Sequence, residues 1–371
     1  MERKRIMLMS GGTGFLMSWL ARRFLEEGYE ILFLVRLATD NTQPEERMRQ
    51  QLGDFKRNQW RVIAGDTTKP LWGIEKNDLS KLKGEVTELW HGAAAVSFNE
   101  YKREAIQQTN VEGTRNTIEV ATFLNVPLHY ISTAYIAHEN VNHIAEETPV
   151  CRVHLRNVYE ETKCDAELFI HQWQKEGKGK AAIYRPAILI GDSRTGEAQG
   201  FTGYYMPAQF LATIREYYWF LIVPYAKNAT LNLIPVDWAA GLIKEIARHP
   251  EAPGKIFHIT HPDPPTIQFL FFHAFRYFGI SRYLLIPTPA FMVMTITKII
   301  DSVLTLLPFR ATKRIQRQFL NYVPYFVGEP RFSQKNVERI LGRPIMLPPI
   351  SKAILGRCLD YAIAHNFKNT Q

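Results

Sequence analysis

The sequence has few cysteines and no internal repeats. Its 371 residues include three cysteines, Cys151, Cys164 and Cys358, which are too few and too scattered for a disulfide framework or a four-ligand metal site. This scarcity predicts a reducing compartment and argues against an extracellular protein. Residues 1–14 pass from about five apolar residues into glycines, too short an apolar run for a signal-peptide core. No period of about 20 to 50 residues recurs, which excludes solenoid folds.

Long uninterrupted apolar runs are also missing. The stretch Tyr283–Phe309 is the most apolar, but Pro287, Pro289, Lys298 and Asp301 interrupt it well before the about 18 uninterrupted residues that a membrane-spanning helix needs. We interpret it as a helix of a substrate-binding lobe. The sequence therefore predicts a cytoplasmic protein whose contact with a membrane, if it has one, is peripheral.

Composition and charge narrow the class of protein. With 46% hydrophobic and 22% charged residues the chain has a globular composition, and its length allows two or three domains. The 45 lysines and arginines outnumber the 36 acidic residues, and the net charge of +9 favours an anionic ligand, carrier or surface. We expect no nucleic-acid partner, because there is neither zinc-finger spacing nor an RNP-type aromatic motif.

Short β-rich apolar runs alternate with helical patterns through the first two-thirds of the chain, which is typical of βαβ units around a parallel sheet. Strands are expected at Arg5–Met9, Glu30–Val35, Arg61–Ala64, Glu88–His91, Leu128–Ser132, Ala182–Arg185 and Ile256–Ile259. Helices are expected at Phe15–Glu27 and Val158–Glu176, each followed by a glycine. The fold class is therefore α/β, a Rossmann-type doubly wound parallel sheet.

The pattern changes in the last third of the chain. A polar, glycine-bearing loop begins near Gly191, and after Pro262 strand alternation largely gives way to long apolar and aromatic helical segments. We expect a dinucleotide-binding domain formed by residues 1–190 and about 232–262. Residues 191–231 and 263–371 would form a smaller, mostly helical substrate lobe.

A glycine-rich segment follows the first strand. Gly11 and Gly14 lie where that strand meets the first helix, so backbone N–H groups and a helix N-terminus can receive a pyrophosphate there. Met17 stands at the position of the third glycine of the usual fingerprint, which predicts a helix set slightly farther from the sheet. A tight turn without a ligand is the alternative interpretation.

The residue after the second strand bears on cofactor choice. Sites for NAD usually place an acidic residue there, whereas this chain has Arg36. A guanidinium cannot accept a proton from the ribose 2′-hydroxyl but pairs well with a 2′-phosphate, which favours NADP(H). The alternative is an arginine in solvent at the end of a strand.

Two pairs of polar residues are candidates for proton transfer and carbonyl binding. Tyr159 and Lys163 are four residues apart on one helix, where the lysine would favour the phenolate and lower the pKa of the tyrosine. Ser132 and Thr133 end the fifth strand at the carboxyl edge of the sheet, where a hydroxyl can stabilise a carbonyl oxygen. A plain surface helix and a capped loop are the respective alternatives.

Taken together, these segments resemble an extended short-chain dehydrogenase/reductase, and within that superfamily the thioester reductase and fatty acyl reductase group. The segments that carry the likeness, in the family's order, are SGGTGFL at 10–16, LVR at 34–36, GD at 65–66, HGAAAVSFN at 91–99, NVEGTRN at 110–116, STAY at 132–135, YEETKCDAE at 159–167, YRPAILIGDSRTGE at 184–197 and PVDWAA at 235–240. They cover about residues 5–260. Beyond that the similarity is loose, chiefly at YVPYFVGEPRFSQKN from 322 to 336.

The resemblance implies a role for each matching residue. Thr133 and Tyr159 would hydrogen-bond the substrate carbonyl oxygen, while Lys163 would hold the nicotinamide ribose and tune Tyr159. The other cofactor-binding residues implied are Gly11, Thr13, Gly14, Phe15 and Leu16 at the pyrophosphate, Arg36 at the 2′-phosphate, Asp66 and Thr67 at the adenine, Ala93 through its backbone, and Pro186 beside the nicotinamide. His91 is interpreted as architectural, and His138 and His143 lack a third ligand, so no metal is expected.

The resemblance favours an NADPH-dependent reductase that takes a fatty or polyketide acyl thioester to the aldehyde, or further to the alcohol. The acyl donor, an acyl-CoA or an acyl carrier protein, would arrive from outside the chain. The alternatives are a ketone or hydroxysteroid-type reductase, a sugar-nucleotide epimerase with the same triad, and a non-catalytic NADP sensor. Oligomeric state does not follow from the sequence.

A cluster of cations follows the apolar stretch. Arg310, Lys313, Arg314 and Arg317 recur at three- and four-residue spacing, so on a helix they would form one basic stripe. Such a stripe is either a solvated face or a site for coenzyme A phosphates, an acidic carrier protein or anionic lipid. The last of these would give the C-terminal lobe a peripheral membrane contact.

Overall fold

The computed structural model describes residues 6–37, 42–136, 143–148, 151, 155–215, 219–305 and 320–368. Its centre is a seven-stranded sheet in which every neighbouring pair is parallel. The strands of this sheet are β1 (Ile6–Ser10), β2 (Glu30–Val35), β3 (Trp60–Ala64), β4 (Val86–His91), β5 (Leu128–Ile131), β7 (Ala181–Pro186) and β11 (Ile256–Ile259). Their order is β11-β7-β5-β4-β1-β2-β3, so the connections reverse direction on either side of β1.

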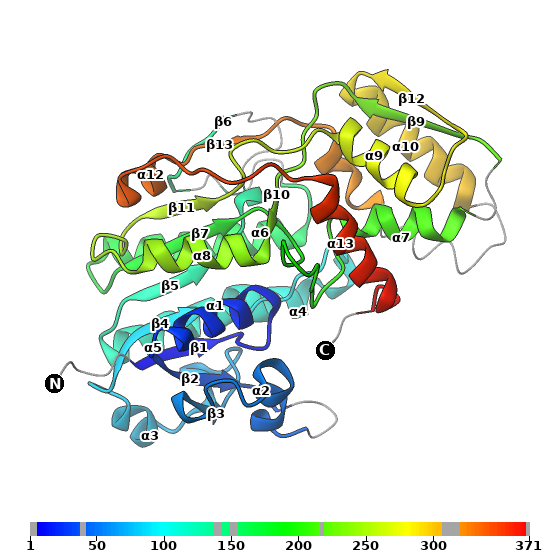
Figure 1. Cartoon of the computed structure of the whole chain (residues 1–371). Helices are drawn as coiled ribbons and strands as arrows, with labels where there is room; N and C mark the ends of the chain where they lie inside the picture. The colour runs from blue at the N-terminus through cyan, green and yellow to red at the C-terminus, as the bar shows by residue number, and fades with distance from the viewer. Residues whose placement is uncertain are drawn as a thin grey trace.

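The seven strands predicted from the sequence are the seven strands of this sheet, with boundaries that differ by at most two residues. The α/β, doubly wound fold class is confirmed. Helices cover both faces of the sheet (Figure 1). The helices are α1 (Phe15–Glu26), α2 (Pro44–Leu52), α3 (Lys76–Lys81), α4 (Arg103–Gln107), α5 (Gly113–Leu124), α6 (Val158–Lys175), α7 (Tyr205–Ile214), α8 (Val236–Ala247), α9 (Ile267–Tyr277), α10 (Ala290–Thr305), α12 (Lys335–Leu341) and α13 (Lys352–Ala364).

The strands bury both of their faces, and alternate residues therefore enter two different cores. In β1, Met7 and Met9 join the core beneath α1 and α8, whereas Leu8 joins the core beneath α5 and α6. The same division separates Phe33 from Leu32 in β2. Successive side chains of a strand point to opposite faces, so a parallel sheet covered on both sides reads as a continuous apolar run.

Helices α1 and α6 each end shortly before the glycine that the sequence indicated. Gly14 is the N-cap of α1, and Gly28, with φ of 85°, follows its end. The side chain of Asn157 caps α6 by accepting a hydrogen bond from the Glu160 N–H at 3.1 Å, and Gly177, with φ of 70°, follows it. Glycine reaches this left-handed backbone conformation at little cost.

Three small two-stranded sheets lie outside the central one. They pair β8 (Ile188–Ile190) with β10 (Leu233–Pro235), β9 (Leu221–Ala226) with β12 (Tyr283–Thr288), and β6 (His143–Ile144) with β13 (Arg331–Phe332), all in parallel. Figure 1 shows β9, β12, α9 and α10 together at one end of the molecule, away from β3. The segment with β13 and α12 returns to pack beside β11 and α8. The division into two domains stays a proposal.

The prediction of one helix over Tyr283–Phe309 is wrong. Tyr283–Thr288 forms strand β12, and α10 begins only at Ala290. The reason is local, because Pro287 and Pro289 lack the N–H that a helix interior requires. No helix in the described part of the chain is long and apolar enough to cross a membrane. The basic stripe of Arg310, Lys313, Arg314 and Arg317 lies outside the described residues.

Candidate active site

A cavity of about 440 Å³ opens at the carboxyl edge of the central sheet. It joins the start of α1, the ends of β5 and β7, the first turns of α6 and a loop that carries aromatic residues from the C-terminal part. The described residues that line it are Gly14, Phe15, Leu16, Met17, Gly92, Ala94, Val96, Phe98, Ile131, Ser132, Thr133, Tyr135, Tyr159, Lys163, Pro186, Ala187, Ile188, Leu189, Gln199, Gly200, Thr202, Gly203, Tyr322 and Tyr325. In this group Lys163 carries the one side chain that is ordinarily charged.

The loop between β1 and α1 has the shape that a pyrophosphate site requires. Gly11 has φ of 78°, and an added Cβ there would lie 2.5 Å from the backbone nitrogen of Ala93. The Gly14 N–H donates to the Gly11 carbonyl at 2.8 Å, and α1 then begins at the cavity with no acidic residue in its first turn. Unpaired N–H groups at the N-terminus of a helix bind phosphate, so the residues fit a dinucleotide.

Met17, at the position of the missing third glycine, is buried against Gly92. An added Cβ on Gly92 would lie 2.3 Å from the Met17 Cγ. Gly92 follows β4, the strand beside β1. The space that the Met17 side chain needs is therefore provided by a glycine that follows the neighbouring strand, and a helix set farther from the sheet stays a prediction.

Arg36 follows β2, as the sequence predicted, with its side chain exposed. A second arginine, which the sequence analysis did not select, lies beside it: Arg47 of α2 donates from Nη1 to the Arg36 carbonyl oxygen at 2.6 Å. Arg36 and Arg47 therefore both lie at this end of β2. Arg36 does not line the main cavity, and a 2′-phosphate site here stays a proposal.

The predicted adenine-binding pair lies after β3. The Asp66 carboxylate accepts hydrogen bonds from the Thr68 N–H at 3.0 Å and from its hydroxyl at 2.9 Å, so one of its oxygens holds the loop. Thr67 is buried, and its carbonyl oxygen accepts from Asn116 of α5 at 2.8 Å. Neither residue lines the main cavity. Their role toward adenine stays a prediction.

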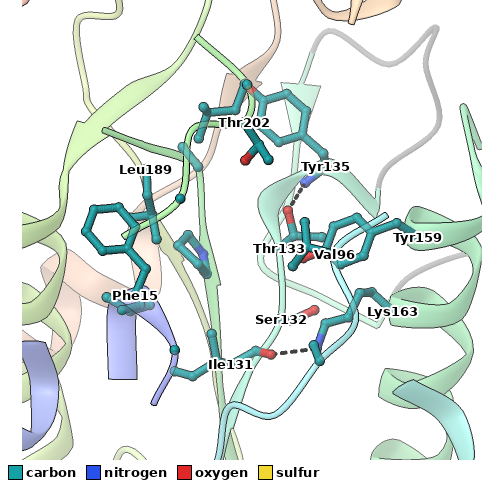
Figure 2. A pocket seen from close by; sticks show the side chains of 18 of the residues that line it. Phe15, Val96, Ile131, Ser132, Thr133, Tyr135, Tyr159, Lys163, Leu189 and Thr202 are labelled. Atoms are coloured by element: carbon teal, nitrogen blue, oxygen red, sulfur yellow. Dashed lines mark hydrogen bonds between the residues drawn. The ribbon is translucent and has the colours of Figure 1, made fainter. Parts of the chain in front are cut away.

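The predicted carbonyl-binding residues do meet. Figure 2 shows Thr133 and Tyr159 side by side at the cavity, from the loop after β5 and from α6 respectively. The Thr133 Oγ1 accepts from the Tyr135 N–H at 3.3 Å, which leaves its own proton available to a ligand. The buried hydroxyl of Ser132 also lines the cavity and has no hydrogen-bond partner among the described residues. It is therefore a second candidate donor for the carbonyl oxygen.

Two hydrogen bonds fix the side chain of Lys163. Its Nζ donates to the Tyr130 hydroxyl at 2.6 Å and to the Ile131 carbonyl oxygen at 2.7 Å, the latter bond visible in Figure 2. Burial lowers the pKa of Lys163 to about 7, although Glu167 opposes that shift. Burial raises the pKa of Tyr159 above its ordinary value, and Glu160 adds to the effect. Lys163 is not among the causes of this shift, so the lowering of the Tyr159 pKa by Lys163 stays a prediction.

A buried hydrogen-bond network extends from Lys163 through Tyr130. Tyr130 is also hydrogen-bonded to Thr114 of α5, whose hydroxyl donates to the Asn110 carbonyl oxygen at 2.7 Å. His91 lies 3.4 Å from Thr114 Oγ1 through Nε2 and 2.7 Å from Ser10 Oγ through Nδ1. Burial lowers the pKa of His91 to about 3, so the ring is neutral. These contacts are architectural, as the sequence analysis expected of His91.

Two aromatic residues that the sequence analysis did not select complete the cavity. Tyr322 and Tyr325 come from the 3₁₀ turn region near Val323–Phe326, more than 150 residues after Tyr159 in the chain. The Tyr325 hydroxyl donates to the buried carboxylate of Glu160, and Asn157 donates to it at 2.8 Å. This turn is therefore fastened to the first turn of α6. The segment YVPYF could be picked out in the sequence, but the contact of Tyr325 with Glu160 could not be predicted from it.

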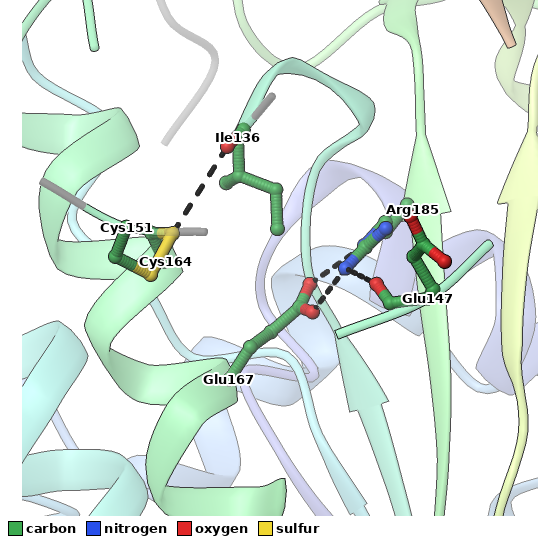
Figure 3. The surroundings of a disulfide bond; sticks show 6 residues. All are labelled: Ile136, Glu147, Cys151, Cys164, Glu167 and Arg185. Carbon is green, nitrogen blue, oxygen red and sulfur yellow. Dashed lines mark hydrogen bonds and ion pairs between the residues drawn. A yellow bond between two sulfur atoms is a disulfide. The ribbon is translucent and has the colours of Figure 1, made fainter. Parts of the chain in front are cut away.

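The helix that carries Tyr159 and Lys163 is also linked covalently. Cys164 of α6 forms a disulfide with Cys151, 13 residues earlier, as Figure 3 shows. The cysteine count was taken to predict a reducing compartment without a disulfide framework, and it gave no indication of this single bond. Nearby, Glu167 of α6 forms a buried ion pair with Arg185 of β7 at 2.7 Å. Cys358 is buried with a free thiol.

The structure brings together part of the predicted set. The predicted residues that line the cavity are Gly14, Phe15, Leu16, Thr133, Tyr159, Lys163 and Pro186. Gly11, Thr13 and Ala93 belong to the segments that border it, and Arg36, Asp66 and Thr67 follow the next two strands. His143 is exposed in β6, and His138 lies outside the described residues.

Comparison with known proteins agrees with this geometry. The sequence profile of the male sterility protein family matches residues 9–243, which is more than half of the chain. The chain belongs to this family. It is an NAD(P)-dependent oxidoreductase of the extended short-chain dehydrogenase/reductase superfamily.

Individual members of the family are modestly similar. The chain is 28% identical over 276 residues to the nonribosomal peptide synthetase asaC of Aspergillus flavus, a match that covers 69% of this chain and 26% of that protein. It is 26% identical over 226 residues to the L-2-aminoadipate reductase of Schizosaccharomyces pombe, covering 56% of this chain and 15% of that protein. The match thus spans about a quarter or less of these relatives.

Among solved structures, the chain resembles the terminal R domain from the myxalamid PKS-NRPS biosynthetic pathway. The TM-score is 0.78 at 22% identity, and the alignment covers 98% of this chain and 92% of that one. At this identity the likeness bears on the fold. It extends the resemblance beyond residue 243 to the C-terminal lobe.

Proposed function

We propose that this reductase uses NADPH to convert a neutral acyl thioester, carried by coenzyme A or by a carrier protein, to the aldehyde or further to the alcohol. The observation that carries the proposal is the cavity itself. Figure 2 shows Lys163, Thr133 and Tyr159 on one side of it, and Phe15, at the start of α1, with Leu189 on the other side. No carboxylate, histidine or cysteine is among the described lining residues.

The lining supports direct reduction of the thioester. Bound NADPH would supply the hydride at the carbonyl carbon. Thr133 and Tyr159 would donate hydrogen bonds to the carbonyl oxygen and stabilise the negative charge that develops there. Because none of the described lining residues is a cysteine, the acyl group would stay on its own carrier thiol until the hemithioacetal collapses to aldehyde and thiol.

Uncharged walls favour an uncharged acyl group. Val96, Phe98 and Leu189 face the cavity, and the Phe98 ring lies 4.9 Å from that of Tyr322. A smaller hollow of about 30 Å³ begins next to it, since Tyr204 and Phe326 line the hollow and their neighbours Gly203 and Tyr325 line the cavity. Burying a charged group against such walls without a partner would be costly.

The proposal is tested with purified protein and NADPH on three substrate classes: acyl-CoAs and acyl-pantetheines, ketones, and nucleotide sugars. We expect loss of reduced-cofactor absorbance with the thioesters, together with release of free thiol, which the other two classes cannot produce. Tyr159→Phe should keep NADPH binding and lose about 10²- to 10⁴-fold in kcat. Turnover of ketones or nucleotide sugars without thiol release from thioesters would contradict the proposal.

A further inference from the structure

The small sheet of β9 and β12 is apolar on both faces. Leu221 and Val223 of β9 and Leu285 of β12 pack against the main core. Ile222 and Leu284, which are register partners, point the other way and are 62% and 50% exposed. A half-exposed sheet normally alternates apolar and polar residues, so an apolar outer face has a function other than folding.

The exposed apolar residues of this chain concentrate around that face. Of fourteen exposed large hydrophobic side chains among the described residues, nine lie between positions 219 and 299. We define the lobe surface as Trp219, Phe220, Ile222, Leu284, Ile286, Phe291, Met292 and Ile299. They belong to β9 and the residues just before it, to β12 and to α10, which Figure 1 shows together at one end of the molecule. Scattered exposed hydrophobics are ordinary, but such a concentration marks a binding surface.

Cations outnumber acidic residues around this surface. Residues 217–236 and 264–300 contain Lys227, Arg276, Arg282 and Lys298, while the one acidic residue of α10, Asp301, comes directly after them. All four cations are exposed. Arg282 directly precedes β12, so a cation lies at the border of the apolar face. An apolar face bordered by lysine and arginine complements a surface that offers hydrocarbon beneath anionic groups.

We propose that the lobe surface docks this protein on the surface of an anionic lipid bilayer. The surface offers two kinds of group, eight bulky apolar side chains and the cations beside them. A bilayer interface accommodates both, because tryptophan and phenylalanine enter the headgroup and acyl boundary while the cations contact lipid phosphates. The inference does not depend on the reaction proposed above.

The test measures co-sedimentation of the full-length chain with vesicles of phosphatidylcholine alone and of phosphatidylcholine with phosphatidylglycerol. Wild type should bind the mixed vesicles more tightly, and added salt should weaken that binding. The pair Ile222→Gln and Leu284→Gln should lower the partition coefficient by about tenfold or more, because two exposed aliphatic side chains that would enter the bilayer are lost. Arg276→Gln with Arg282→Gln should weaken binding to the mixed vesicles only.

The matched control is Met346→Gln with Ile363→Gln, two exposed apolar residues outside the lobe surface. This pair should bind vesicles as wild type does, and thermal unfolding checks that both pairs fold. Failure of wild type to bind either vesicle, or equal loss in both pairs, would overturn the proposal. So would a lobe surface that mediates self-association in light scattering, or capture of an acidic carrier protein, without vesicle binding. None of these readouts depends on catalytic activity.

Discussion

Met17 occupies the space that a side chain at position 92 would need, since an added Cβ on Gly92 would lie 2.3 Å from the Met17 Cγ. The two positions are therefore coupled: a large residue on α1 requires the smallest one after β4. Gly92 has an ordinary backbone conformation rather than a left-handed one. Its requirement is for space alone.

The coupling predicts a non-additive pair of substitutions. Gly92→Ala should lower the free energy of unfolding by about 1–3 kcal/mol, because it overpacks a buried contact. The same change in a Met17→Ala background should cost little, since the obstructing side chain is gone. Urea unfolding of the four variants measures the coupling. Gly241→Ala in α8, where an added Cβ meets nothing within 4 Å, is the control and should be neutral or stabilising.

Cofactor choice is predicted to depend on Arg36. Arg36→Asp should weaken NADPH binding by about 10- to 100-fold, because a charge-assisted phosphate contact is lost and a repulsion is added, while NADH binding changes little. Fluorescence titration with both cofactors measures the difference. Arg49→Asp, an equal charge change at an exposed position of α2, should leave the ratio of affinities unaltered. Equal weakening of both cofactors by Arg36→Asp would show that this residue does not read the phosphate.

The hydroxyls of Ser132 and Thr133 are predicted to act together on the carbonyl oxygen. Thr133→Ala should lower kcat by about 10²-fold, the usual effect of removing one donor to a developing oxyanion. Ser132→Ala should also lower kcat and leave KM for NADPH unchanged, because its hydroxyl has no partner in the described structure that would otherwise consume the proton. Steady-state kinetics on the same thioester compares the two. Wild-type kcat in Ser132→Ala would return Ser132 to a packing role.

The sequence predicted the sheet better than the lobe. The strand predictions held because each strand is buried on both faces and therefore reads as a short apolar run, as in Glu30–Val35. Strand β12 was predicted as helix because Tyr283–Thr288 is apolar in the same way, and a short apolar run does not by itself distinguish the two. Its partner β9 lies about 60 residues earlier, and that pairing is not encoded locally.

The site was predicted where a motif is contiguous in sequence. Tyr159 and Lys163 are one turn apart on α6, and Thr133 lies two residues after the end of β5, so their meeting follows from the fold. Tyr325 reaches the cavity from a distant turn, and the contact that fixes it, with Glu160, joins residues 165 apart. The burial that raises the pKa of Tyr159 was also not predicted, because it depends on residues far apart in the chain.

The pKa of Lys163 predicts a pH dependence. Burial lowers it to about 7, so the ammonium form is present below that pH and is lost above it. If the charged amine holds the cofactor ribose, kcat/KM for NADPH should fall as pH rises through about 7, since this parameter reports the free enzyme. Tyr130→Phe removes an acceptor of an Nζ proton, which disfavours the charged form, so the decline should move to lower pH.

The control for that experiment is Tyr184→Phe, which removes another buried phenol, one that is hydrogen-bonded to His129 at 3.0 Å and does not line the cavity. It should leave the midpoint of the pH profile in place. A profile for Tyr130→Phe that coincides with that of wild type would contradict a role for Tyr130 in positioning Lys163.

The disulfide predicts a stability that responds to reductant. It joins two cysteines 13 positions apart in the sequence, and a cross-link over such a separation contributes about 3 kcal/mol to the free energy of unfolding. Dithiothreitol should therefore lower the unfolding free energy of wild type by about that amount. It should have no effect on Cys151→Ser, which already lacks the bond. Cys358→Ser, which changes the free buried thiol, should respond to reductant as wild type does.

Turnover of Cys151→Ser below its melting temperature should stay near that of wild type, because Lys163 is held by Tyr130 and Ile131 rather than by the cross-link. Wild type that unfolds at the same urea concentration with and without dithiothreitol would show that the bond does not stabilise the chain.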